Sequence, residues 1–162
     1  MPSQHQSAVS ISDQLSIVDS LSALPFPKQE GRPGKDRRWG GPEYHLAVLR
    51  ESQDFWDDRS EDVVEAAQRE LEADLAVLVA TLTSRWGSPE MVALWPYLGL
   101  DTTEADFVAP QPLGFLSSVA VSMHMWRLPN SERWIALAIG QADPEWPFQL
   151  LVAVGEASAL RR

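Results

Sequence analysis

Three histidines are the side chains of this chain best suited to proton transfer, and one of them alternates with a serine on a predicted strand. They are His5, His45 and His124. Ser122 and His124 are two positions apart, a pattern that could combine a hydroxyl nucleophile with a general base. On one strand face, however, such neighbours have Cβ atoms roughly 7 Å apart, which exceeds direct hydrogen-bond reach. We therefore expect His124 to be structural and predict no catalytic residue.

The chain lacks the residue spacings that hold metals, phosphates and iron–sulfur clusters. It contains no Cys, and none of its His residues are spaced as in helical zinc sites. The acids between Asp54 and Asp62 lack the glycine and the fixed spacing of a calcium loop. The Trp-Gly-Gly-Pro stretch at 39–42 lacks the Lys and Ser or Thr of a phosphate-binding loop. We expect neither a metal nor a cofactor.

The overall charge excludes two classes of partner. The 162 residues include 23 Asp and Glu against 13 Lys and Arg, a formal net charge of −10. Nucleic-acid binding needs a cationic face, and so does attraction to anionic lipids. The sequence therefore predicts no nucleic-acid partner and no membrane partner.

Leader and membrane-span signals are also absent from the sequence. Its first twenty residues have no basic start followed by an apolar run, and no stretch approaches the roughly 18 apolar residues of a membrane span. This favours a cytoplasmic protein. Arg greatly outnumbers Lys, as in GC-rich bacterial genomes, so we expect a bacterial source.

Acidic residues are most concentrated between residues 41 and 74. This stretch has eleven Asp and Glu but only three Arg, which gives a local net charge of −8. Trp146 lies in a turn beside further acids and Pro residues, where burial in a core is difficult. An exposed Trp among acids suits a contact with a cationic protein. We therefore predict these partner-binding residues: Asp57, Asp58, Glu61, Asp62, Asp143, Glu145 and Trp146.

The clearest structural element is a helix over about 60–86. Its apolar residues recur every three or four positions, and Gly87 followed by Pro89 ends the pattern. Asp58 and Glu61 have the spacing of a capping box at its start. Trp86, Trp95 and Trp134 are expected in the core.

Residues 114–155 predict three strands joined by short turns. The segment around 119–126 alternates, 134–139 is apolar throughout, and 148–154 places its large apolar residues on one face. Short connections favour an antiparallel meander. The predicted fold is α+β, with the long helix packed on a C-terminal antiparallel sheet of three or more strands.

Three other segments carry weaker signals. Helical spacing predicts a helix over 43–55, and 91–98 reads as either a helical turn or a short strand. The Pro residues near its end indicate a loop over 99–112.

Composition divides the chain near residue 40. Residues 1–40 are rich in Ser, Gln, Pro and Gly, which predicts a disordered or weakly ordered segment with a basic linker at 28–38. Residues 41–162 form a single α+β domain in this prediction. Apolar residues at helical spacing between Ile11 and Leu21 leave open a helix that docks on the domain.

Three classes of function remain, and one is favoured. The acidic charge, small size and missing catalytic motif favour a protein-binding module for a cationic protein, in the manner of bacterial immunity proteins or small chaperone-like adaptors. The first alternative is a small-molecule-binding protein or enzyme with a pocket between helix and sheet, lined by Ser122, His124 and Trp126. The second is an oligomer-forming structural protein, such as a homodimer that pairs its sheet edges.

Overall fold

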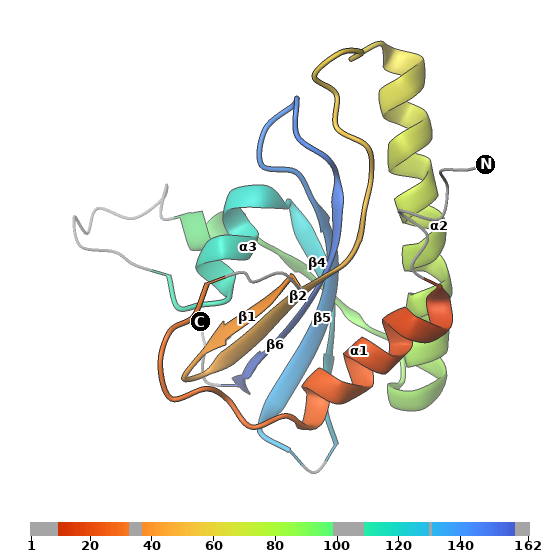
Figure 1. The fold of residues 1–162 in the computed structure, drawn as a ribbon. Coiled ribbons are helices and arrows are strands. Elements are labelled where there is room, and N and C mark those ends of the chain that lie inside the picture. Colours follow the sequence, from red (N-terminus) through yellow and green to blue (C-terminus); the bar gives the residue numbers. More distant parts are fainter. Residues whose placement is uncertain (1–9, 33–36, 99–108, 130, 158–162) are drawn as a thin grey trace.

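The computed structural model describes residues 10–32, 37–98, 109–129 and 131–157. In these ranges three α-helices accompany a six-stranded antiparallel sheet, which confirms the predicted α+β class (Figure 1). The elements follow in the order α1 (Ile11–Ala23), β1 (Arg38–Gly41), β2 (Tyr44–Glu51), α2 (Glu61–Trp86), β3 (Glu90–Ala93), a 3-10 turn (Trp95–Leu98), α3 (Leu113–Val119), β4 (Ser122–Arg127), β5 (Arg133–Gly140) and β6 (Gln149–Glu156).

The sheet has the strand order β1-β2-β6-β5-β4-β3. Strands β4, β5 and β6 are the three that the sequence predicts, and β4–β5 and β5–β6 pair as an antiparallel meander. The segment 91–98 contains both expected alternatives, since β3 is followed by the 3-10 turn. The sheet is thus twice as wide as the predicted meander.

The predicted helix over 43–55 is wrong, because Tyr44–Glu51 forms strand β2 between β1 and β6. Five of its first six side chains are buried, so both faces of the strand are covered. A strand covered on both faces has no alternation of apolar and polar residues, and its spacing can resemble that of a helix.

Helix α2 begins and ends almost where the sequence predicts. Its buried residues Ala67, Leu71, Leu78 and Leu82 form a stripe that packs against one face of the sheet. Gly87, with φ of 89°, ends the helix in a conformation that favours glycine. The predicted capping box is wrong: Ser60 is the N-cap residue and makes no side-chain capping bond.

Helix α1 lies beside α2 on the same face of the sheet (Figure 1). Ser10 caps it by accepting the amide hydrogen of Asp13, and Val18 and Leu21 are buried in the core. The docked helix, which the sequence leaves as the alternative to a weakly ordered segment, is therefore the observed arrangement. The division at residue 40 falls inside β1.

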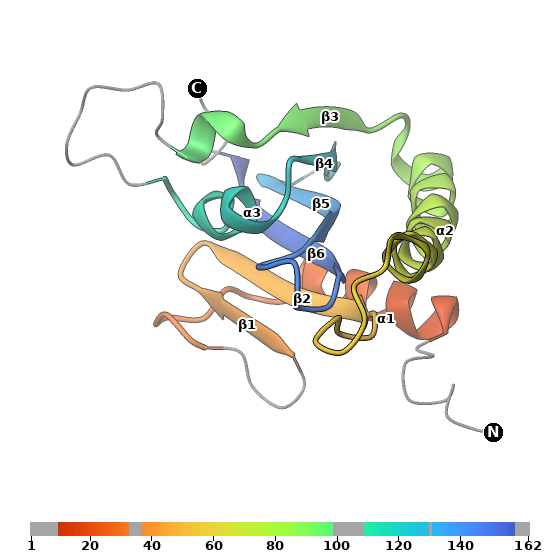
Figure 2. The ribbon, with the colours of Figure 1, turned by 90° about the horizontal axis from the view of Figure 1, so that it is seen from above.

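The opposite face of the sheet is covered by α3 and the 3-10 turn (Figure 2). Leu113 and Leu116 of α3 and Leu94 pack there against Trp134. Helix α3 occupies the start of a region that the sequence assigns to the sheet. Trp134 is in the core as expected and Trp86 is partly buried, whereas Trp95 is 54% exposed, contrary to the prediction.

No helix in the described ranges is long and apolar enough to cross a membrane.

Candidate functional site

Two segments far apart in the sequence meet at one end of the molecule. The loop before α2 and the β5–β6 turn run side by side there, at the top of Figure 1. The amide of Phe55 donates to the carbonyl of Glu145 at 2.8 Å, and the rings of Phe55 and Phe148 meet edge-on at 5.6 Å. Arg59 forms an ion pair with Glu145 at 3.2 Å. These contacts give both segments a fixed relative position.

This arrangement brings the seven predicted partner-binding residues to the same end, which we call the acidic end. The side chains of Asp57, Asp58, Glu61, Asp62 and Asp143 are exposed. None of these five carboxylates forms an ion pair with the described part of the chain. Glu145 differs, because Arg59 neutralises it in part.

Two exposed Trp residues accompany these acids. Trp146 is 49% exposed, as expected from its turn, and Trp56 is 62% exposed. Trp56 is not among the predicted partner-binding residues, although it lies directly before Asp57 and Asp58 and so has acidic neighbours in the sequence, as Trp146 does. The acidic end therefore presents both charge and apolar area.

Asp58 also shapes the loop that leads into α2. Its Oδ1 accepts the amide hydrogen of Ser60 at 2.9 Å, and this hydrogen bond lowers the pKa of Asp58. The carboxylate therefore stays charged at neutral pH. This bond, in place of the predicted capping box, fixes the entry into the helix.

A groove of about 370 Å³ lies next to the acidic end, and we call it the aromatic groove. Trp39 and Phe115 meet edge-on at 5.3 Å in its wall, and Trp146 joins them. Its polar lining consists of Gln149 and the ion pair of Arg37 with Glu51, which are 2.7 Å apart. Burial raises the pKa of Glu51, but the hydrogen bonds from Arg37 and Gln149 prevail and lower it overall. Trp146 thus belongs to both the acidic end and this groove.

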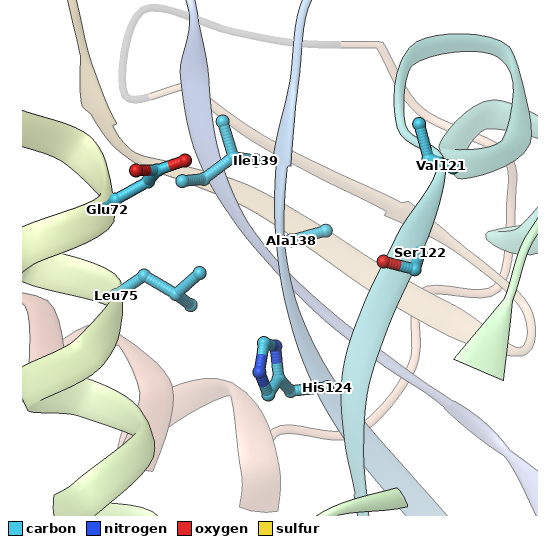
Figure 3. Close-up of a pocket in the computed structure, with 7 residues that line it drawn as sticks. All are labelled: Glu72, Leu75, Val121, Ser122, His124, Ala138 and Ile139. Atoms are coloured by element: carbon cyan, nitrogen blue, oxygen red, sulfur yellow. The ribbon is translucent and has the colours of Figure 1, made fainter. Parts of the chain in front are cut away.

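A second, smaller pocket lies between α2 and strands β4 and β5 (Figure 3). Ser122 and His124 line it, as the small-molecule alternative expects, together with Glu72 of α2. Trp126 does not line it, because its side chain is buried and its indole N–H donates to the carbonyl of Gly87 at 2.9 Å. We call this the helix–sheet pocket.

Metal binding finds no support among the described residues, where no three His, Asp or Glu side chains are grouped to hold an ion.

Comparison with known proteins gives no match: no family model, no curated protein and no solved structure is similar to this chain.

Proposed function

We propose that the protein is a small protein-binding module whose acidic end docks on a cationic protein. The observation that carries the proposal is the convergence of two distant acidic segments beside two exposed Trp residues. Bacterial immunity proteins and small adaptors share the acidic charge and the small size of this chain. The analogy concerns this general class of protein and implies no common family.

The charge pattern supports a cationic partner. Concentrating like charges at one end reduces stability through repulsion, so an advantage elsewhere is expected to offset that cost. Carboxylates that form no ion pair with the described residues attract a positive surface, speed the encounter and exclude acidic competitors.

The exposed apolar area supports docking over a role in solubility alone. Charge by itself gives solubility, and exposed Trp side chains would oppose that role. Trp supplies large contact area and is frequent among the residues that dominate binding energy. The aromatic groove beside Trp146 could receive an apolar side chain of the same partner.

Affinity capture from a lysate of the native host tests the proposal. The protein with Asp57, Asp58, Glu61 and Asp62 changed to Lys is compared with wild type. A matched control reverses four exposed acids away from this end, namely Asp13, Glu43, Glu90 and Glu132, so both variants change the net charge equally. A basic protein that wild type and control retain, and the acidic-end variant loses, supports the proposal. Equal retention by all three contradicts it.

A homodimer through β3 is the second candidate function. Strand β3 is an outer strand of the sheet; its own Met91 is 57% exposed, and Trp95 and Val121 beside it are 54% and 83% exposed. An outer strand of this kind can pair with another copy. Sedimentation of wild type and Met91→Glu at two protein concentrations tests this, since a dimer would dissociate in the variant.

A further inference from the structure

The helix–sheet pocket brings three polar side chains around one small space. Glu72 comes from α2, and Ser122 and His124 come from β4 on the opposite side (Figure 3). Leu75, Val121, Ala138 and Ile139 complete the lining. The pocket measures about 180 Å³, which is room for roughly six water molecules at about 30 Å³ each, or for one small organic molecule.

The hydroxyl of Ser122 and the imidazole of His124 have hydrogen-bonding capacity to spare. Both side chains are half-buried, and neither forms a side-chain hydrogen bond with the residues that the structure describes. Glu72 accepts one hydrogen bond, from Gln68 at 3.3 Å, which leaves its other oxygen available. Polar groups placed in an otherwise apolar pocket are the usual means of orienting a small ligand.

The charges around the pocket decide which ligand it suits. Glu72 is negative, and burial lowers the pKa of His124, so its imidazole is neutral at pH 7 and can accept a hydrogen bond. A carboxylate ligand would be repelled by Glu72, whereas an ammonium group would be attracted. The hydroxyl of Ser122 can donate or accept, as can a ligand hydroxyl.

We propose that the helix–sheet pocket binds a small amino alcohol. Its ammonium group lies at Glu72, and its hydroxyl group reaches Ser122 and His124 across the pocket. This site shares no residue with the acidic end, so the inference is independent of the proposed docking function.

An NMR titration of the full chain with ethanolamine at about 150 mM salt tests this inference. The ring protons of His124 and the amide of Ser122 are expected to shift and to saturate at millimolar concentrations. Ethylamine lacks the hydroxyl and should bind about fivefold more weakly, because it loses one neutral hydrogen bond. Ethylene glycol carries a second hydroxyl in place of the ammonium group and should bind about tenfold more weakly, because its hydrogen bond to Glu72 no longer joins two charges.

A matched pair of variants separates the pocket from general attraction of cations. Glu72→Gln should weaken ethanolamine binding about tenfold, the effect of losing one charged hydrogen bond. Glu65→Gln removes the same charge two turns earlier on α2, outside the pocket, and should stay within about twofold of wild type. Thermal unfolding of both variants checks that they remain folded. Absence of a saturable shift up to about 100 mM, equal binding of the three probes, or an equal loss in both variants would overturn the inference.

Discussion

Two groups of acidic residues in this protein differ in what surrounds them. Asp74 and Glu51 lie against the body of the fold, where their side chains are 18% and 26% exposed, and form ion pairs with Arg50 and Arg37. Five carboxylates of the acidic end are exposed and make no ion pair with the described residues, namely those of Asp57, Asp58, Glu61, Asp62 and Asp143. A carboxylate of either group adds the same charge, but only the first group is expected to stabilise the fold.

Asp74 shows how the first group works. Its Oδ2 accepts hydrogen bonds from Arg50 of β2 and Gln14 of α1, both at 3.0 Å. One carboxylate of α2 therefore connects α2 to a sheet strand and to the first helix. We therefore expect position relative to the core, and not charge density, to decide which acids stabilise the structure.

The largest effect on stability is expected from removal of α1, the helix that Asp74 connects to α2 through Gln14. Deleting residues 1–24 should lower the free energy of unfolding by more than about 4 kcal/mol, because Val18 and Leu21 leave the core and the apolar surface beneath them is exposed. Chemical denaturation followed by circular dichroism measures the loss.

Point variants check that packing causes this loss. Leu21→Ala should cost about 2–5 kcal/mol, and Leu24→Ala, where the side chain is 42% exposed, should cost much less. A thermal midpoint within a few degrees of wild type after the deletion would show that α1 contributes little to stability.

The next effect compares one acid from each group. Asp74→Ala should lower the free energy of unfolding by about 2 kcal/mol, because Arg50, whose side chain is only 19% exposed, then keeps only the exposed Glu70 as an ion-pair partner, and Gln14 loses the same acceptor. Asp57→Ala should change it by less than about 0.5 kcal/mol, as is usual for exposed positions. Urea denaturation of both variants measures the two values, and equal losses would remove the distinction between the groups.

Much of the fold was predictable because its signals are local. Helix α2 has an apolar stripe and a glycine stop, and β4 to β6 combine apolar strands with short turns. Strand β2 was not predictable from periodicity, because both of its faces are buried. Strands β1 and β3 have four residues each, too few to establish an alternation.

The candidate site was predictable only in part. The high local density of Asp and Glu in the sequence identified the acids of the site. Trp146 was identified because it lies in a turn beside acids and Pro residues. The contact that joins the two segments, Arg59 with Glu145, spans 86 positions and depends on how β5 and β6 pair. The helix–sheet pocket likewise requires α2 to lie across β4, which places Glu72 opposite His124.

A smaller effect on stability is expected from the titration of a buried histidine, His45. His45 is 4% exposed, and its Nε2 lies 3.1 Å from the carbonyl of Leu24, just after α1. Burial lowers the pKa of His45, and nearby Arg133 adds to this, while the Leu24 carbonyl opposes it. Because the unfolded chain then binds the proton more readily, stability should fall as the pH drops below about 6.5.

His45→Gln keeps a side-chain N–H for the Leu24 carbonyl and removes the titration. Its stability should therefore fall less between pH 7 and pH 5 than that of wild type. His124 has a lowered pKa as well, so His124→Gln provides a second comparison. Denaturation at three pH values measures the slopes, and identical slopes for wild type and both variants would show that other groups carry the acid sensitivity.

A small effect on stability is also expected at Trp56, and the neighbouring residue Phe55 supplies the contrast. Phe55 is fully buried against Phe148, so its side chain holds the acidic end in place, whereas Trp56 is 62% exposed. Trp56→Ala should change the free energy of unfolding by less than about 1 kcal/mol, since little of its area leaves solvent on folding.

If the acidic end docks on a cationic partner, Trp56→Ala should also speed dissociation by about tenfold, as for a Trp that dominates an interface. Reversal of Asp57 and Asp62 should instead slow association, and increasingly so at low salt. Surface plasmon resonance with the captured partner separates the two rates. Strong destabilisation of Trp56→Ala would show that Trp56 supports the fold. Dissociation at the wild-type rate would show that Trp56 does not contribute to docking.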